Sequence, residues 1–527
     1  MKIIVRFTRG KFRQMALGLA VGCLSLASSA GAADQTNAPA ATNAPAAQPY
    51  GKKPKEGFFR RLNEAEAEQF GTPCFSPPDT NNPAPVRRIG PTPFDSPPYP
   101  DGDWQIGGGP SVIGDPGALR DSPYPLMQAI YDGPNGKAWY DSRIQFYGWV
   151  TVGGNISTSH NYAAGSTPNF PEVYNERSDR VENDQDVLYI ERMADENQTD
   201  HMDWGFRLAI LYGLDYRFMA SRGYLNDVNL LENNHFSGLD TPMMYANLYI
   251  PKVAEGMNII LGRIISEPDI EQQLAPNNLM MSHSLVYSFD NYTMWGLWTS
   301  TKLNANWLLQ VGLADGVDIA PWEHQDPGDQ PTGSVMVQYI APGGHDSFYV
   351  GMNSFNNGTF GFNNLQECIE SYTHKFNDTW WTTFEGQYMY MKNCTTTPTA
   401  TVPYQDGFYP TKNGTVAEGG IVNYTMCRTS ANSFLTFRNE WYDDPFGART
   451  GYSSSYYEGS IGMQWWPNKL LMFRPEIRYE RCFAQHGLAS ATASDNPTGA
   501  PYPVNGAYDN GTKHQQVTLA VDVTYHF

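Results

Sequence analysis

A long hydrophobic run is missing from this chain. Its one extended apolar stretch, Met15–Ala30, is shorter than the ~20 residues that an α-helix needs to cross a bilayer. In lipid every backbone polar group must be hydrogen-bonded within the protein, and only helices and closed barrels achieve this. If the protein resides in a membrane, it must therefore do so as a β-barrel.

Acidic residues are absent from the first 33 residues. The basic residues there are Lys2, Arg6, Arg9, Lys11 and Arg13, and Ala30-Gly31-Ala32 supplies the small side chains that signal peptidase reads. Residues 1–33 are thus predicted to be a secretory signal peptide. A membrane anchor fits less well because the apolar run is short, and a lipoprotein signal at Cys23 fits less well because Ala20-Val21-Gly22 is a poor lipobox.

Positive charge is scarce in the chain as a whole. It has 35 basic and 54 acidic residues and a net charge of −19, which becomes about −24 when the five basic residues of the predicted signal are removed. No basic stripe remains that would contact phosphates. Nucleic acid is therefore not an expected partner.

The chain has too few cysteines for disulfide bonds to be the main stabilisation of its fold. Of six cysteines, Cys23 lies in the predicted signal peptide, and the other five match neither a zinc-ligand spacing nor a dense disulfide scaffold. Neither a metal site nor a cofactor is predicted. Export permits disulfides, so two alternatives stay open: Cys394 pairs with Cys482, or all five thiols remain unpaired.

Proline, by contrast, is concentrated before residue 142. Asp34–Glu56 is a low-complexity Ala/Pro tether that is expected to be disordered, and Phe58–Phe70 predicts one short helix. Thr72–Asn135 contains fifteen prolines and predicts extended chain with turns. Residues 57–141 could plug the lumen of a barrel, lie beneath it in the periplasm, or form a partly ordered linker.

The last thirteen residues, Gln515–Phe527, alternate strictly between apolar and polar side chains. The apolar face includes Phe527, Tyr525 and Val523. A terminal aromatic residue on such a strand is typical of bacterial outer-membrane barrels, whose last strand pairs with the first. These residues are predicted to close the barrel and to carry its assembly signal, with the outer-membrane barrel assembly machinery as a partner.

Alternating segments fill the chain from Ser142 onward. The sixteen predicted strands are residues 142–153, 185–194, 203–214, 242–251, 257–265, 293–300, 306–313, 333–340, 347–354, 364–375, 380–391, 418–427, 433–442, 454–466, 470–481 and 515–527. Long and short connections alternate between them, as in barrels with long outer loops and short periplasmic turns. The predicted fold is an all-β, up-and-down antiparallel transmembrane barrel of about 16 strands.

Charged residues in these strands fall between the apolar positions. Because a basic residue on the lipid face costs about 2–4 kcal/mol at the bilayer midplane, such residues are expected in the lumen. The predicted pore-lining residues are Arg207, Arg263, Glu385, Arg438, Glu440, Arg474, Glu476, Arg478 and Glu480. They would filter solutes by charge and size, or they would pair as salt bridges that stiffen the wall.

Acidic runs mark several long connections, among them Glu267–Glu271. A solvated outer surface is the expected role of these runs. Attraction of cations to a pore mouth is the alternative.

Catalytic patterns are weak. Glu440, Asp443 and Asp444 are acids from which a glycosidase could take an acid and a nucleophile, and His283 lies between Ser282 and Ser284, but nothing fixes a third partner. No catalytic residue is predicted. A hydrolase carried on the barrel is the least favoured alternative.

Several phrases, in their order and spacing, resemble the OmpL-like family of β-barrel porins. They are DWGFRLAILYG (203–213), GLDTPMMYANLYIP (238–251), MNIILGR (257–263), SHSLVYSF (282–289), RNEWYDDPFGARTG (438–451) and WWPNKLLMFRPEIRYE (465–480). The matching positions are Trp204, Gly205, Arg207, Gly262, Arg263, Ser282, His283, Glu440, Trp441, Asp444, Pro475, Glu476 and Arg478. The resemblance implies an outer-membrane porin without cofactor or catalytic residues. The chain departs from the family at IISEPDIEQQ (264–273), where a Pro-Ile-Gly turn is usual, so a folded constriction loop is not carried over.

The sequence therefore predicts an outer-membrane porin that lets small hydrophilic solutes or ions diffuse through a charged lumen. Outer-membrane lipid would surround it, and a homotrimer is a common assembly for barrels of this size. The alternative is a plugged barrel whose long loops serve as a structural or ligand-binding surface.

Overall fold

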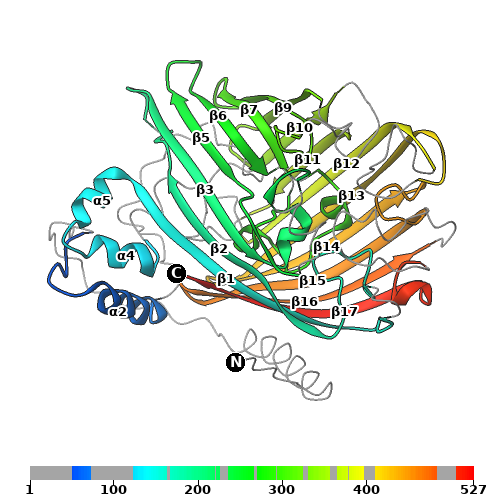
Figure 1. Cartoon of the computed structure of the whole chain (residues 1–527), viewed down its shortest axis with the longest axis horizontal. Helices are drawn as coiled ribbons and strands as arrows, with labels where there is room; N and C mark the ends of the chain where they lie inside the picture. The colour runs from blue at the N-terminus through cyan, green and yellow to red at the C-terminus, as the bar shows by residue number, and fades with distance from the viewer. Residues whose placement is uncertain are drawn as a thin grey trace.

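The computed structural model describes residues 50–72, 123–162, 167–196, 198–219, 221–225, 236–265, 270–291, 293–323, 330–356, 365–377, 379–396, 410–483 and 506–527. In these ranges, antiparallel strands form one closed sheet, and short helices lie at one end of it (Figure 1). Within the same ranges, no helix combines the length and the apolar character that crossing a membrane requires.

The strands and helices have the following bounds. The strands are β1 (Ile144–Ser157), β2 (Arg180–Arg192), β3 (Asp203–Gly213), β4 (Gly238–Asp240), β5 (Met244–Ile250), β6 (Met257–Ile265), β7 (Thr293–Lys302), β8 (Trp307–Ala314), β9 (Thr332–Ile340), β10 (Asp346–Phe355), β11 (Gln366–Lys375), β12 (Trp380–Cys394), β13 (Gly414–Ser430), β14 (Ser433–Asp444), β15 (Ser454–Asn468), β16 (Leu471–Cys482) and β17 (Gln515–His526). The α-helices are α2 (Phe58–Phe70), α4 (Pro125–Tyr131), α5 (Gly136–Ser142) and α7 (Leu285–Ser288), and the 3-10 turns are η3 (Asp215–Met219), η5 (Ala275–Asn277) and η7 (Asp509–Gly511).

The sheet closes where the last strand meets the first. In this pair His526 lies opposite Trp149, and the backbones of Phe527 and Gly148 exchange two hydrogen bonds of 2.9 and 3.2 Å. β4 and β5 both pair with β3 and together occupy one position in the wall. The seventeen labelled strands therefore fill sixteen positions around the barrel, which we call staves. The predicted sixteen-strand antiparallel barrel is confirmed.

Each predicted strand overlaps one stave of the barrel. The largest difference is in β2, which starts at Arg180 instead of residue 185; β13 starts four residues before the predicted range 418–427, and β1 ends four residues after the predicted range 142–153. The short β4 was not predicted. It is separated from β5 at Thr241-Pro242, where proline has no N–H to donate to the ladder.

The wall of the barrel is apolar outside, whereas its inner side carries charged residues together with clusters of buried apolar and aromatic side chains. On β16 the side chain of Ile477 is exposed, whereas the flanking Glu476 and Arg478 are buried; on β3 Trp204 is exposed and Arg207 is buried. Exposed Leu, Ile, Val and aromatic residues recur on the outer side of many staves, as expected for a surface that faces lipid. The interior is therefore where charged residues collect.

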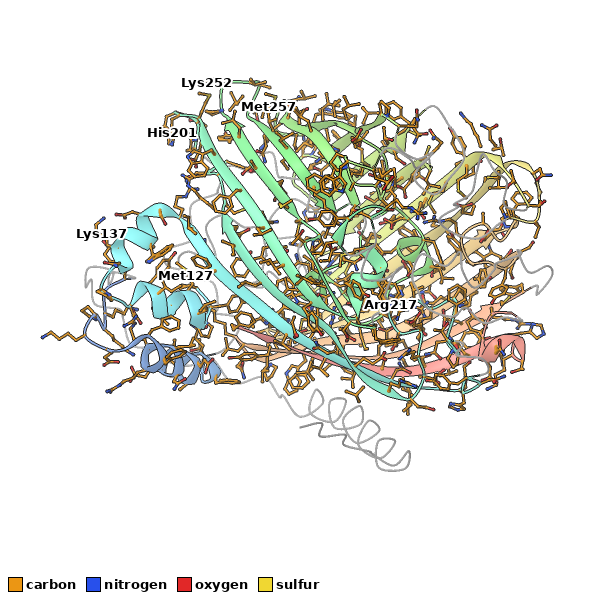
Figure 2. All side chains as sticks on the ribbon, viewed as in Figure 1. Met127, Lys137, His201, Arg217, Lys252 and Met257 are labelled. Atoms are coloured by element: carbon orange, nitrogen blue, oxygen red, sulfur yellow. The ribbon has the colours of Figure 1, made fainter. Side chains whose placement is uncertain are left out.

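Loop length separates the two ends of the barrel. The short connections include 303–306, 376–379, 431–432 and 469–470, and the long ones include 158–179, 214–237, 266–292 and 483–514. His201 and Lys252 lie on neighbouring short turns at one end, and Arg217, on a long connection, lies well away from them (Figure 2). This is the predicted alternation of loop lengths.

Three helices near the N-terminus gather at the short-turn end. α2 coincides with the predicted helix and is joined to α4 by a 2.8 Å hydrogen bond from Arg61 Nε to the Ala129 carbonyl. The prediction of extended chain is wrong for residues 125–131, which form α4. Its first residue is Pro125, whose fixed φ and missing N–H suit the first position of a helix.

These helices contact the closing strands. Phe70 stacks on Tyr525 with ring centroids 6.0 Å apart, and the Tyr525 hydroxyl donates to Glu66 over 3.1 Å. Tyr124 stacks on His526 at 5.1 Å. The described part of residues 57–141 thus lies at the mouth of the barrel. The predicted signal peptide, most of the tether and residues 73–122 lie outside the described residues.

The described cysteines form no disulfide. Cys394 and Cys482 are both buried, and Cys368 and Cys427 are partly buried. The structure therefore has the second of the two alternatives at Cys394 and Cys482. Cys74 lies outside the described residues.

Candidate functional site

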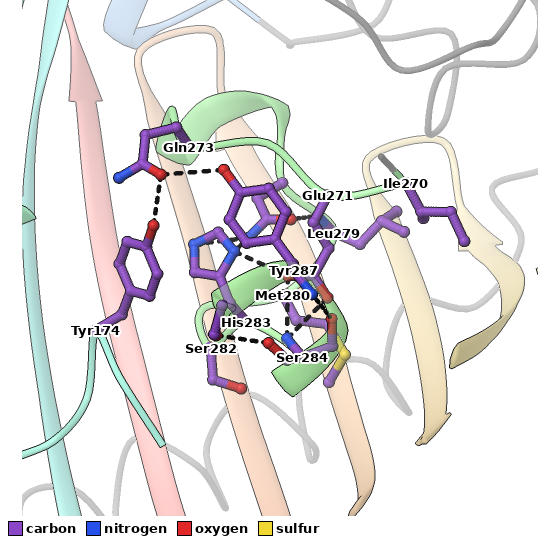
Figure 3. A network of polar contacts seen from close by, with 12 residues as sticks. Tyr174, Ile270, Glu271, Gln273, Leu279, Met280, Ser282, His283, Ser284 and Tyr287 are labelled. Atoms are coloured by element: carbon purple, nitrogen blue, oxygen red, sulfur yellow. Dashed lines mark hydrogen bonds and ion pairs between the residues drawn. The ribbon is translucent and has the colours of Figure 1, made fainter. Parts of the chain in front are cut away.

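Residues 270–291, between β6 and β7, fold into the lumen and form what we call the inward segment. It contains η5 and α7, and nearly all its residues are buried (Figure 3). Two expectations are corrected here. A constriction loop is present although the local Pro-Ile-Gly turn is missing, and Glu271, expected on a solvated surface, is 3% exposed.

Arginines on the wall supply donors to the backbone of the inward segment. Arg474 Nη1 donates to the carbonyls of Ala275, Asn278 and Met280 over 2.7, 3.1 and 2.9 Å. Arg438 Nη1 donates to the Ser282 carbonyl over 2.7 Å. An irregular backbone cannot be buried without such partners, so these arginines fix the path of the segment across the lumen.

Glutamates on the wall supply the matching acceptors. Glu440 accepts the N–H groups of Leu285 and Val286 over 2.8 and 2.6 Å, so one carboxylate holds the first turn of α7. Glu476 accepts the Ser282 N–H over 3.0 Å, and Glu385 accepts the Ile270 N–H over 2.5 Å. The segment is therefore attached through its main chain as well as through apolar side chains such as Leu285 and Val286, which pack in a buried cluster with wall residues.

Arg438 is the central cation of this network. Its guanidinium lies 3.1 Å from Glu458, 3.3 Å from Glu476 and 3.6 Å from Glu271. All four side chains are at least 98% buried. Because loss of one partner of a buried ion pair leaves an uncompensated charge, the wall and the segment depend on each other at this point.

Glu271 connects the start of the inward segment to residues 283–284 of the same segment and to the wall. Its carboxylate lies 2.8 Å from His283 Nδ1, accepts the Ser284 N–H over 2.9 Å and accepts the Tyr424 hydroxyl (Figure 3). Burial alone would raise the pKa of Glu271. The hydrogen bond and charge of His283 and the charge of Arg438 outweigh burial and lower that pKa to about 2.

His283 has the surroundings of a structural residue. Its ring lies between those of Tyr174 and Tyr287, with centroids 4.1 and 4.6 Å away. The neighbouring hydroxyls are engaged elsewhere: Ser282 Oγ contacts Glu476, Arg438 and Arg478, and Ser284 Oγ accepts the Tyr287 N–H at the start of α7. A Ser-His pair of the kind that a hydrolase needs is not formed by these neighbours.

The second catalytic alternative, the Glu440 and Asp444 pair, also has structural partners. Asp444 accepts the N–H groups of Ala448, Arg449 and Thr450 over 2.9, 3.0 and 2.8 Å and thereby fixes the turn after β14. Within the described ranges, no three His, Cys, Asp or Glu side chains are arranged to hold a metal ion.

Eight of the nine predicted pore-lining residues are buried on the inner side of the wall. They are Arg207, Glu385, Arg438, Glu440, Arg474, Glu476, Arg478 and Glu480. Five of them contact the inward segment through the bonds given above. Arg478 joins them through the His283 carbonyl, and Arg207 pairs with Glu191 at 2.7 Å. Glu480 pairs with Arg478 at 2.7 Å.

Arg263 is the exception and is a correction. It pairs with Met244 on β5 and with Trp295 on β7, in the register of the exposed Leu261 and Leu297 on the outer side of the wall. Its guanidinium is enclosed by residues near the long loops, 2.9 Å from Asp240 and 2.9 Å from Ser221 Oγ. The rule that buried charge in a strand faces the lumen fails here because loops cover the outer side.

The predicted closing residues occupy the outer side of β17. Val523, Tyr525 and Phe527 alternate with Thr524 and the other buried residues of that strand. Their role as an assembly signal stays a prediction.

Sequence reasoning missed several residues of the network. Strand alternation alone places Glu458 and Glu418 on the inner side, so both could have been predicted from the sequence. Arg449 was not: it lies beyond β14 and donates to the Phe289 and Asp290 carbonyls over 2.8 Å each. No local pattern around Arg449 indicates that contact.

A closed barrel with an apolar outer wall, a charged lumen and an inward segment defines the class of outer-membrane porins. The model of the family described as "Putative beta-barrel porin-2, OmpL-like" matches residues 143–527, and the chain belongs to this family. The resemblance inferred from sequence is confirmed, and the outer membrane is the location of the protein.

Solved structures of bacterial outer-membrane channels are similar to the chain at low identity. The anion-selective porin from Comamonas acidovorans matches with a TM-score of 0.47 and 12% identity over 73% of this chain and 99% of that chain. OprB of Pseudomonas putida gives 0.45 and 9% over 75% and 98%, and the channel DcaP of Acinetobacter baumannii gives 0.42 and 12% over 73% and 97%. The comparison with curated proteins gave no match.

Proposed function

We propose that this porin lets small hydrophilic solutes or ions diffuse passively through its lumen, and that the inward segment sets the size limit. The observation that carries the proposal is the attachment of residues 270–291 to the charged wall. Membership in a porin family and the closed sixteen-stave barrel support it. A barrel of about sixteen strands encloses a water-filled lumen, and a segment that crosses this lumen narrows the path that a solute takes.

Placement in the outer membrane completes the proposal. Residues 1–33 would direct export, the barrel assembly machinery would recognise the last strand, and no cofactor or catalytic residue would be needed. A homotrimer is the proposed assembly. Cross-linking of the protein in native membranes checks the number of subunits.

Planar-bilayer recording of the purified, folded protein tests conduction. Stepwise conductance is the expected result. Replacement of residues 272–290 by a short Gly/Ser linker should raise the unitary conductance at least twofold, because the lumen is then less obstructed. A linker of equal length replacing residues 484–505, between β16 and β17, is the control and should leave the conductance within about 20% of the parent, since the bonds described above for the inward segment come from other residues. Silent bilayers with protein that migrates as folded barrel on a detergent gel would contradict the proposal.

A second candidate role is a barrel that is closed or gated from the short-turn end. The observation that favours it is the docking of α2 and α4 against Tyr525 and His526 at the mouth. Deletion of residues 34–135 distinguishes the two roles. Conductance that appears only after the deletion supports gating, whereas equal conductance with and without these residues supports the open porin.

A further inference from the structure

The inner face of β10–β13 carries carboxylates without basic partners on the same strands. Glu367, Glu385 and Glu418 are buried there, and among the described residues of these four strands no lysine or arginine is buried. Each carboxylate must therefore find another kind of partner. Glu385 accepts the Ile270 N–H, and Glu367 accepts amide N–H groups from Asn353 and Gln387, each over 2.6 Å.

Glu418 differs from these neighbours. Its side chain is 3% exposed, and both carboxylate oxygens are buried without a hydrogen-bond partner. Asp444 is the last residue of β14, the strand next to β13. Its carboxylate accepts the N–H groups of residues 448–450. The guanidinium of Arg449 donates to the Phe289 and Asp290 carbonyls.

Two more buried polar atoms without partners lie beside Glu418. Gly420 is opposite Gln387 on β12 and opposite Tyr442 on β14, and Glu418 is two residues along the same face of β13. Residues in such diagonal positions are close enough for long side chains to meet. The Gln387 Oε1 and Tyr442 Oη atoms are both buried and unpaired. Four buried oxygen atoms with unused acceptor capacity thus belong to side chains on three adjacent strands at the level of Gly420.

The inward segment forms the other side of this group. A Cβ at Gly420 would lie 2.7 Å from Val286 Cγ2, so glycine is what lets α7 approach the wall here. The group of oxygens therefore lies next to the part of the segment that narrows the lumen.

We propose that Glu418, with Gln387 and Tyr442, is a stopping site for a small monovalent cation, and that the pore conducts cations in preference to anions. The inference rests on the proposed porin function. A buried carboxylate without a partner is unfavourable, and a cation that keeps part of its water shell supplies what the oxygens lack. The three-ligand geometry of a bound metal is absent among the described residues, which agrees with transient passage. Potassium and a small alkylammonium ion share the required chemistry.

Reversal potentials in a tenfold KCl gradient test the proposal. The full-length protein should favour K⁺ over Cl⁻, and Glu418→Gln should lower the K⁺/Cl⁻ permeability ratio at least threefold while single-channel conductance persists. Glu418→Asp should retain most of the preference because the charge remains. Glu370→Gln is the matched control: it removes a carboxylate from the exposed side of β11, which is two strands away from β13, and should leave the ratio unchanged.

The outcomes separate failure of the site from failure of the porin function. An anion-selective or unselective parent channel overturns the cation preference but keeps the porin function. A cation-selective parent whose ratio is unaffected by Glu418→Gln overturns the role of Glu418. A folded parent that does not conduct overturns both. Methylammonium chloride in place of KCl tells whether the site accepts organic cations as well as K⁺, and rejection of both ions overturns the proposal.

Discussion

The two halves of the lumen wall use charge in different ways. On β14–β17, acids and arginines alternate, and Arg438, Glu440, Arg474 and Glu476 are bonded to the backbone of the inward segment. On β10–β13 the buried charges are carboxylates, and Glu418 has no hydrogen bond at all. Both halves look alike in sequence because strand alternation places charge on the inner side in either case.

The difference shows that an inward-facing charge need not face solute. A charged side chain that is hydrogen-bonded to a buried main chain stabilises the fold, and its atoms are not free to bind an ion. The charged wall therefore has a part that anchors the inward segment and a part, at Glu418, whose carboxylate oxygens are buried without hydrogen-bond partners.

The largest expected effect comes from removal of the central anchor. Arg438→Met leaves Glu458 and Glu476 buried without their cation, which should cost about 3–5 kcal/mol of barrel stability. Urea unfolding of the protein in detergent, followed by gel mobility, measures the loss. Arg481→Met, at an exposed position of β16, is the control and should change stability by less than about 0.5 kcal/mol. Equal stability of both variants would show that the anchoring half is not coupled to the segment.

A smaller effect distinguishes the two halves directly. Glu440→Ala leaves the N–H groups of Leu285 and Val286 without an acceptor and should cost about 1–3 kcal/mol, with increased current noise as α7 loosens. Glu418→Gln removes an unpartnered carboxylate and should leave stability unchanged or increase it. The comparison fails if Glu418→Gln destabilises the barrel as much as Glu440→Ala does. The same urea titration measures both variants.

The smallest expected effect is an acid dependence at Glu271. Its pKa in the folded protein is about 2, below the ordinary glutamate value of about 4.3, so its stabilising contribution is present above about pH 4.3 and is lost as pH falls toward 2. Conductance should stay constant from pH 7 to 5 and increase below about pH 4 as the segment loosens. Glu271→Gln should already show the increased conductance at pH 7. A parent channel that closes on acidification would contradict this assignment.

Much of the barrel could be predicted because its determinants are local. Alternation along β3, β12 and β16 identifies the outer face, since a strand turns successive side chains to opposite sides. Loop lengths give the order of the staves, and the apolar face of Gln515–Phe527 indicates the closing strand. Eight of the nine charged residues predicted to line the pore are buried at alternating positions of their strands, which is the pattern that identified them.

The path of the inward segment could not be predicted in this way. Its backbone is held by Arg474, Glu440 and Glu476, which lie more than 150 residues away in the chain. Its local sequence, IISEPDIEQQ, gives no turn signal and reads as an exposed acidic loop. Arg263 was misplaced for a related reason, because long-loop residues distant in sequence cover the outer side of β6.

By itself the sequence determined which residues form staves, which side of each stave meets lipid, and which end of the barrel has long loops. These properties follow from side-chain period and turn composition, which act over a few residues. Only the tertiary structure decided what each buried charge does. Whether a carboxylate holds a backbone N–H, as Glu440 does, or is left without a partner, as Glu418 is, depends on which distant segment folds against it.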